Sequence, residues 1–182
     1  MTTQSTRFKN NYLAKGLALA AALSSTAVLA DPVIFGMELG KTTEEQIKTL
    51  YNVQHTGTNK YSNGSMYSVP PSSIDFDGLQ EVTTIFDRKG VLVAVLTDFP
   101  KSKFNYLKSA IGGKYQKVSE KIPFVGNKSA TYRDGETEIT LDAPHMSFTM
   151  SMNYIRDDFM RTFNSQSEAE RRRKQSNESS QL

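Results

Sequence analysis

The chain of 182 residues contains no cysteine. That absence excludes disulfides, thiol chemistry, cysteine-ligated zinc and iron–sulfur clusters. Histidine is scarce as well: the two histidines, His55 and His145, lie far apart and outside any paired-histidine motif. A histidine-based metal site needs such a pair, so we expect neither a metal nor a cofactor.

Motifs that carry catalysis or phosphate binding are missing too. The nucleophile motif GxSxG, the dinucleotide motif GxGxxG and the P-loop GxxxxGK[ST] do not occur. The two glycines of "IGGKY" follow an apolar helical pattern, which is typical of the end of a helix. These absences favour a protein that is not an enzyme.

The first 30 residues indicate export. They carry three basic residues and no acidic one, and continue into "GLALAAALSSTAVLA". This apolar run is too short, and too rich in Ala and Ser, for a bilayer span of about 20 residues. We expect a signal peptide over residues 1–30, cleaved between Ala30 and Asp31, and an exported, periplasmic mature protein. No cysteine follows the run, so we expect no lipid anchor.

The basic character of the chain comes from this leader. The formal net charge is +3, with 22 basic and 19 acidic residues. Because three of the basic and none of the acidic residues lie in residues 1–30, the remainder has a net charge of zero. A neutral domain has little electrostatic attraction for nucleic acid, so we expect no nucleic-acid partner.

The mature sequence shows alternating helix and hairpin patterns. Helices are predicted in "TTEEQIKTLY", with Thr42 or Thr43 as cap and Ile47 and Leu50 on an apolar side, and in "SKFNYLKSAIGGKY", with Ser102 as cap. Between them, "LQEVTTIFDRKGVLVAVLTDF" predicts a hairpin. The segment 53–73 is read as a long loop with a strand near Met66–Val69.

A second strand-rich block starts at "KYQKVSEKI" and includes a hairpin around Asp134-Gly135. "IDFDG" (74–78) and "IPFVG" (122–126) each precede a hairpin, which leaves duplication and coincidence open. We predict an α+β fold: an antiparallel sheet built from hairpins, two short helices and a C-terminal helix, with two helix-plus-sheet repeats as an open alternative. The domain spans 31–164, and the polar tail 165–182 is predicted to be partly helical or disordered.

"DAPHMSFTMSMNY" (142–154) contains one of the two histidines. Apolar and polar residues alternate strictly from His145 to Tyr154, which predicts a strand with one apolar face. The alternative is a hydrolase or small-ligand site in which Asp142, Asp75, Asp77 or Tyr154 converge on His145.

The tail carries the densest charge cluster, Arg171, Arg172, Arg173 and Lys174. It is a candidate contact for an acidic partner or an anionic membrane surface. The alternative is ion pairing within one exposed helix, since Glu168 and Glu170 precede the cluster at helical spacing.

The segment "FGMELGKTTEEQIKTLY" (35–51) resembles the opening helix of two groups of small bacterial envelope proteins: the outer-membrane-assembly small lipoproteins (the SmpA/OmlA group) and the β-lactamase-inhibitor-like proteins. The chain departs from them in lacking a lipid-bearing cysteine and disulfides. The resemblance implies a non-enzymatic, protein-binding role and transfers no site residue.

Together these patterns predict an exported, non-catalytic protein that binds another envelope or secreted protein, as an assembly factor, inhibitor or immunity protein. Two alternatives stay open: a hydrolase or ligand-binding domain using His145, and a peripheral membrane protein attached through the basic tail.

Overall fold

Two units, each a helix followed by four strands, make up most of the chain. This computed structural model describes residues 31–182, and the predicted signal peptide lies outside the described residues. The first unit consists of α1 (Glu44–Leu50), β3 (Gln54–Thr58), β4 (Asn63–Ser68), β5 (Glu81–Asp87) and β6 (Leu92–Pro100). The second consists of α2 (Phe104–Gly112), β7 (Gln116–Lys121), β8 (Lys128–Asp134), β9 (Thr137–Ala143) and β10 (Thr149–Arg156). A short hairpin, β1 (Val33–Ile34) and β2 (Met37–Glu38), precedes them, and α3 (Asp157–Ser179) follows.

All eight strands of the two units form one antiparallel sheet in the order β3-β4-β5-β6-β10-β9-β8-β7. The second unit mirrors the first, and the units join where β6 pairs with β10, from Ala94 opposite Ile155 to Pro100 opposite Thr149. The structure thus confirms the α+β class, the hairpin-built antiparallel sheet, the two short helices and the C-terminal helix. It also confirms the two helix-plus-sheet repeats.

The segments that suggested the duplication are not equivalent, however. "IDFDG" (74–78) lies between β4 and β5, whereas "IPFVG" (122–126) lies between β7 and β8. By position in the sheet, β5 and β6 correspond to β9 and β10, not to the hairpin β8–β9. The structure therefore has two repeats, but the sequence comparison aligned the hairpin β5–β6 with β8–β9, which is one strand too early. The error arose because any hairpin has a similar local pattern of strand, turn glycine and strand.

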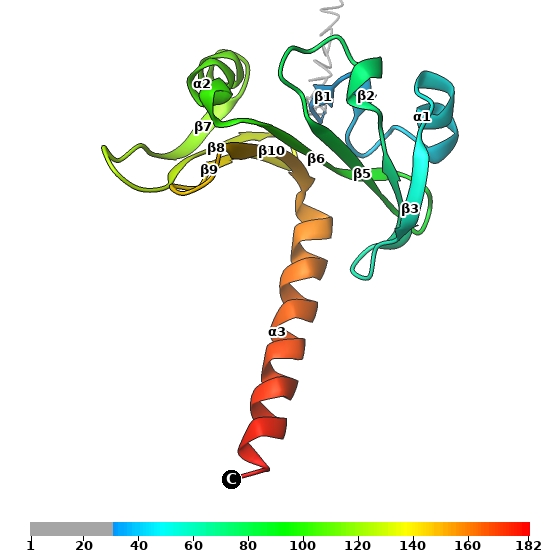
Figure 1. Cartoon of the computed structure of the whole chain (residues 1–182). Coiled ribbons are helices and arrows are strands. Elements are labelled where there is room, and N and C mark those ends of the chain that lie inside the picture. Colours follow the sequence, from blue (N-terminus) through cyan, green and yellow to red (C-terminus); the bar gives the residue numbers. More distant parts are fainter. Residues whose placement is uncertain (1–30) are drawn as a thin grey trace, which may run out of the picture.

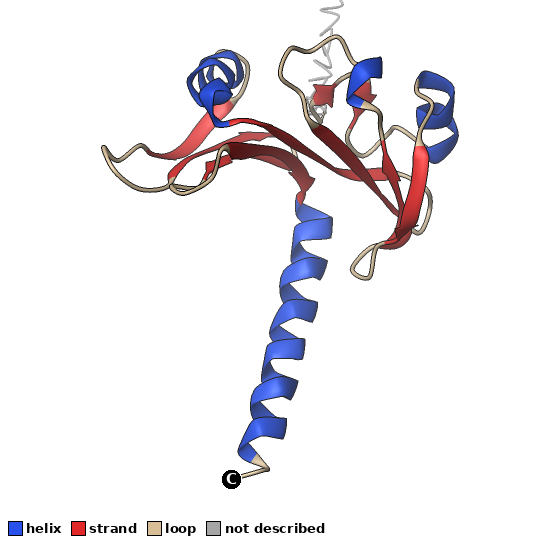
Figure 2. Ribbon diagram, viewed as in Figure 1, coloured by secondary structure: helices blue, strands red, loops and turns tan. Residues whose placement is uncertain are grey.

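The two faces of the sheet differ in cover. Helices α1 and α2 and the hairpin β1–β2 lie over one face, and α3 leaves from the opposite one (Figure 1, Figure 2). The main core fills the covered face, and its largest fully buried side chains are Tyr132, Phe86, Phe99, Met37, Leu39 and Ile47. On the opposite face a small cluster of Ile85, Val93 and Ala94 contacts Ile155 and Phe159, beside the start of α3.

The first helix begins as its sequence predicts. Thr43 is the cap: its Oγ1 accepts the Gln46 N–H at 3.3 Å, and the Gln46 Oε1 accepts the Thr43 N–H at 2.8 Å. Ile47 is fully buried, but Leu50 is 52% exposed and lies outside the apolar face. The second helix ends at Gly112 as expected, whereas Ser102 is not its cap, because a 3₁₀ turn, Lys101–Lys103, precedes it.

Two other predictions need correction. Most of the predicted loop 53–73 is the hairpin β3–β4, whose polar residues lack the apolar alternation of a half-buried strand because both of its strands lie at or near the sheet edge. The strand predicted from His145 starts only at Thr149, and Met146 and Phe148 lie in the preceding loop, 89% and 94% exposed. Pro144 opens this loop.

The tail belongs to one continuous helix from Asp157 to Ser179. Of the two states predicted for the tail, helical or disordered, the structure shows the helical one. None of the side chains of α3 is buried. The helix projects from the sheet instead of lying flat on it (Figure 1).

Candidate functional site

The loops that join the strands form two equivalent ends of the sheet. The first-unit loop end consists of the β3–β4 loop (59–62) and the β5–β6 turn (88–91); the second-unit loop end consists of the β7–β8 loop (122–127) and the β9–β10 loop (144–148). Since β6 and β10 are antiparallel, these two sets of loops lie at opposite ends of the strands. They differ sharply in side-chain chemistry.

The second-unit loop end exposes large apolar side chains. Phe124 is 104% and Phe148 94% exposed, values that mean almost no contact with the rest of the protein. Contiguous apolar groups on a surface mark sites for protein or membrane contact. The exposed apolar side chains of this end are Ile122, Phe124, Val125, Met146 and Phe148.

The backbone beneath these side chains is firmly held. The His145 N–H donates to the Asn127 Oδ1 at 2.8 Å, which joins the two loops. The Lys101 ammonium donates to the carbonyl oxygens of Pro144 and, at 2.9 Å, His145, and the Lys101 N–H donates to the Phe148 carbonyl at 2.8 Å. The β9–β10 loop, which carries Met146 and Phe148, is therefore bonded to Lys101 and to Asn127 of the β7–β8 loop.

His145, the residue of the alternative ligand site, lies within this end as an exposed loop residue. Two of its four proposed helper residues are engaged elsewhere. Asp77 is bonded to Lys103, whose ammonium lowers the pKa of that carboxyl, and Tyr154 is buried in the main core. Within residues 31–182 no group of three histidines and carboxylates is placed to hold a metal ion.

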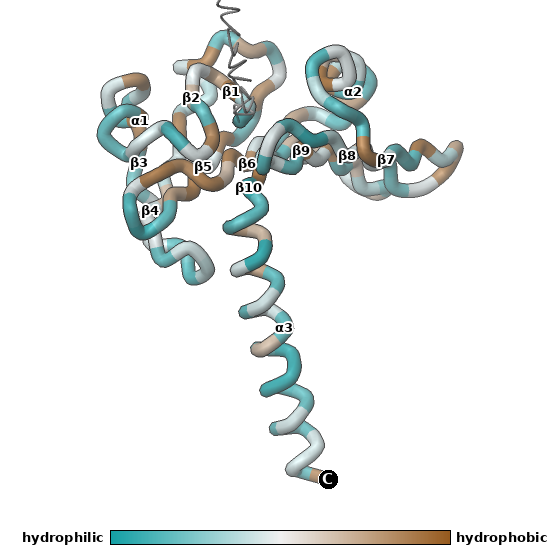
Figure 3. The backbone as a smooth tube through the Cα atoms, turned by 180° about the vertical axis from the view of Figure 1, so that it is seen from behind, coloured by the Kyte–Doolittle hydropathy of each residue, from teal (hydrophilic) through white to brown (hydrophobic). Residues whose placement is uncertain are grey.

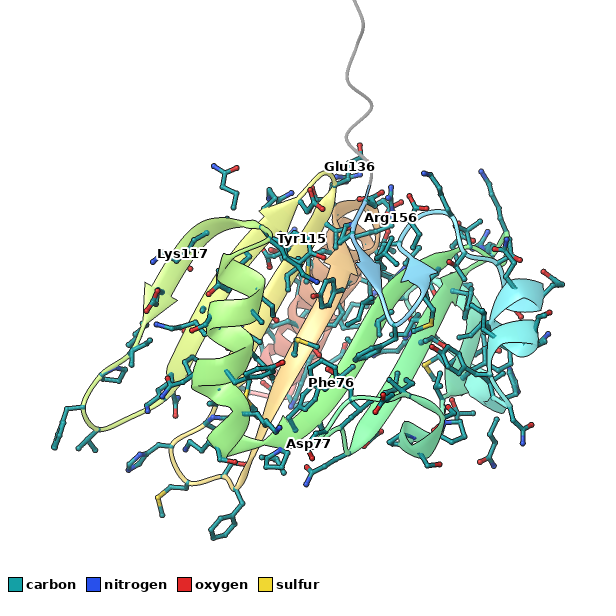
Figure 4. All side chains as sticks on the ribbon, turned by 90° about the horizontal axis from the view of Figure 1, so that it is seen from above. Phe76, Asp77, Tyr115, Lys117, Glu136 and Arg156 are labelled. Atoms are coloured by element: carbon teal, nitrogen blue, oxygen red, sulfur yellow. The ribbon has the colours of Figure 1, made fainter. Side chains whose placement is uncertain are left out.

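An apolar cleft of about 180 Å³ lies near the seam between the units. It is lined by residues of β1, α2 and β10, including Tyr154, and by Phe76 and Tyr115 from the adjoining loops (Figure 4 labels Phe76 and Tyr115). Burial raises the pKa of the Tyr154 hydroxyl, and the neighbouring Tyr115 acts in the same direction. The hydroxyl therefore stays protonated near neutral pH and supplies no base. The cleft is too small for a drug-sized ligand, which needs about 300 Å³ or more.

An arginine cluster fixes the base of α3. The Arg156 guanidinium, 13% exposed, contacts the carboxylates of Asp31, of Glu136 at 2.8 Å and of Asp158 at 3.4 Å (Figure 4). Burial lowers the pKa of Arg156, but the three carboxylates outweigh it and the pKa is raised. Arg133 adds a bidentate pair with Asp157, 2.7 and 3.1 Å.

The first-unit loop end holds the next turns of α3. The rings of Tyr61 and Phe163 meet edge to face with centroids 4.7 Å apart, and Lys60 pairs with Glu170 at 3.1 Å. Helical spacing allows Glu170 to pair with Lys174 and Glu168 with Arg172. Glu170 pairs with Lys60 instead, and Lys174 lies 3.9 Å from Glu178, while the pair Glu168–Arg172 is present at 3.2 Å.

The basic cluster Arg171–Lys174 lies beyond these contacts, on the exposed far half of α3. That half is polar all round, as the teal tube in Figure 3 shows. No helix within residues 31–182 is long and apolar enough to cross a membrane. No family model, curated protein or solved structure matches the chain.

Sequence reasoning found the basic cluster and His145 but missed the apolar second-unit loop end. A signal was present: "IPFVG" and "PHMSF" place large apolar residues beside proline and glycine, which interrupt a strand. In the second segment the apolar residues continue the alternation of the predicted strand, which places them on its apolar face, whereas "IPFVG" is recognised only as a segment that precedes a hairpin.

Proposed function

We propose that the protein is an exported, non-catalytic binding protein of the cell envelope that presents α3 to another envelope protein. The observation that carries this proposal is the helix itself. It has 23 residues, none of them buried, and the domain fixes only its first half.

A polar helix of this kind gains little from its own sequence. Isolated helices are marginal in water, and most helical stability in proteins comes from packing of an apolar face. The far half of α3 has no such face, and its polar surface suits a helix that bridges to another body. The contacts of Arg156, Arg133, Tyr61 and Lys60 hold the near half in one direction, which supports a role in presenting the far half.

The basic cluster suggests the kind of partner. At a rise of 1.5 Å per residue, Arg171–Lys174 lie about 20–25 Å along the helix from Asp157. Exposed arginines recognise carboxylates through bidentate hydrogen bonds, so an acidic protein surface fits them. Such a role agrees with the envelope-protein resemblance of residues 35–51, as an assembly factor, inhibitor or immunity protein.

The experiment is affinity capture from native periplasmic and membrane extract with the mature chain, residues 31–182. Two variants accompany it: a chain that ends at Ser165, and replacement of Arg171–Lys174 by alanine. A matched control replaces four other exposed lysines, Lys41, Lys48, Lys89 and Lys114, with alanine, which removes the same charge.

We expect a partner that the mature chain and the control retain and both tail variants lose. Equal capture by all four proteins would contradict presentation by α3. Export is tested separately: intact mass of the protein from the periplasmic fraction should correspond to a chain that starts at Asp31.

A further inference from the structure

We propose that the second-unit loop end docks the protein onto a lipid bilayer that carries anionic headgroups. This surface is separate from the far half of α3, so the inference goes beyond the proposed function. The occupant is a bilayer surface. Phe124 and Phe148 contact it, and lysines of the same chain segments lie near its headgroups.

Three chain segments meet at this end. Pro100–Lys103, 121–128 and 143–149 are joined by strand pairing, since Lys121 lies opposite Ser129 in the sheet and Lys128 opposite Ala143. The hydrogen bonds of Lys101 and Asn127 complete the junction. These contacts bring the segments that carry the apolar side chains to the same end of the sheet.

The same three segments carry lysine and no acidic residue. Their lysines are Lys101, Lys103, Lys121 and Lys128. Lys103 is neutralised by Asp77, Lys101 is bonded to the loop carbonyls of Pro144 and His145, and one exposed carboxylate, Asp142, lies near the end of β9. Within residues 31–182, Lys121 and Lys128 have no ion pair with a carboxylate, so their charge is available to an anionic surface.

The shape of the surface favours a bilayer over a protein. Phe124 lies within the β7–β8 loop and Phe148 at the end of the β9–β10 loop, and both are fully or almost fully exposed, so they protrude. A protein partner would need a separate pocket for each side chain, whereas a bilayer accepts protruding apolar groups without a matching shape. Apolar side chains that insert between headgroups, flanked by lysine, are the two components of interfacial membrane binding.

The test uses vesicles of phosphatidylglycerol and phosphatidylethanolamine, and vesicles of phosphatidylcholine alone. The mature chain, residues 31–182, should sediment with the anionic vesicles. Phe124→Ser with Phe148→Ser should weaken binding by about tenfold or more, since two large apolar groups no longer leave water. Lys121→Gln and Lys128→Gln should each weaken it by about fivefold at low salt.

Insertion can be seen directly because the chain has no tryptophan. Phe124→Trp introduces a single indole, whose emission should shift to shorter wavelength with anionic vesicles and be quenched by brominated lipid. Leu50→Trp, at another exposed apolar position, is the matched control and should show no shift.

Several outcomes would overturn the proposal. One is a mature chain that binds neither kind of vesicle. Others are binding that survives the double serine variant, or binding that is lost when Arg171–Lys174 become alanine, which would place the contact on the tail. A dimer that the double serine variant abolishes would show that a second copy covers this end.

Discussion

The two loop ends occupy equivalent positions in a duplicated fold, yet their side chains have different surroundings. The first-unit loop end is polar and makes its contacts within the molecule: the Asp87 carboxylate accepts the N–H groups of Lys89 and Val91, and Tyr61 contacts Phe163. The second-unit loop end has its backbone bonded but its apolar side chains in solvent. Equivalent backbone positions therefore do not imply equivalent contacts.

The cause of the difference is the position of α3. The helix follows β10, whose last residues lie beside the first residues of β6, so it emerges next to the first-unit loop end. A cleft of about 310 Å³, lined by Tyr61, Arg88, Phe159 and Gln166 among others, separates that end from the helix. No described element takes the corresponding place at the other end (Figure 1).

The largest expected effect follows from freeing the base of α3. Arg156→Met should lower the free energy of unfolding by about 3 kcal/mol, because Asp31 loses its partner in a largely buried site. Urea unfolding measures this. Arg172→Met, which also removes an arginine–carboxylate pair but an exposed one, should change it by less than about 0.5 kcal/mol. Equal effects of the two variants would contradict the conclusion that the Arg156 ion pairs fix the base of α3.

A second prediction is that the two loop ends lose stability together, as parts of one cooperative domain. Because burial holds the pKa of Tyr154 above that of an unfolded tyrosine, about 10, stability is fully present below that pH and is lost as the pH rises above it. The loss is about 1.4 kcal/mol per pH unit for one such group.

Tyr154→Phe should lessen this alkaline loss at both ends together, as followed by hydrogen exchange of amides in the two sets of loops. Tyr106→Phe, at a 59% exposed site, should leave it unchanged. Ends that respond at different pH values would show that the units unfold separately.

The direct comparison exchanges one phenylalanine for serine at each end. Phe163→Ser should cost about 1 kcal/mol, because it removes the aromatic pair with Tyr61. Phe124→Ser should cost less than about 0.5 kcal/mol, since its side chain contacts almost nothing. Thermal unfolding of both variants checks this, and a similar loss for the two would mean that Phe124 has a partner within the molecule.

A smaller effect than that of Phe163→Ser should come from the lysine beneath the apolar loops. Lys101→Met removes the hydrogen bonds to the Pro144 and His145 carbonyls and should cost about 0.5–1 kcal/mol. The informative readout is local: faster amide exchange at His145 and Phe148 with unchanged exchange at Tyr61. Unchanged exchange at all three would mean that Lys101 does not order the loop.

Local chemistry accounts for the parts of the fold that the sequence predicted. Thr43, the paired glycines after Ile111 and the alternation from Val82 to Phe86 each determine a turn, cap or strand within a few residues. The α+β class followed from the order of these elements, whereas the repeat stayed an open alternative, suggested by two segments that are not equivalent.

Long-range packing decided the rest. Apolar and polar residues alternate in the same way before and after Thr149. The residues before Thr149 form a loop because the pairing with β6 begins only at Thr149. The pairing of Lys60 with Glu170 across 110 residues, and hence the direction of α3, has no local signal. For the same reason the basic cluster could be identified from sequence, but its distance from the domain could not.

The central position of β10 also governs the order of folding. This strand is the last of the sheet along the chain, yet it lies between β6 and β9. Until it is in place, β6 presents the apolar stretch "LVAVL" on an unpaired edge, a configuration that favours pairing with other chains. Because β10 pairs with β6 only after β7, β8 and β9 have followed along the chain, we expect this long-range pairing to be the slow step in refolding, and the stage at which aggregation competes.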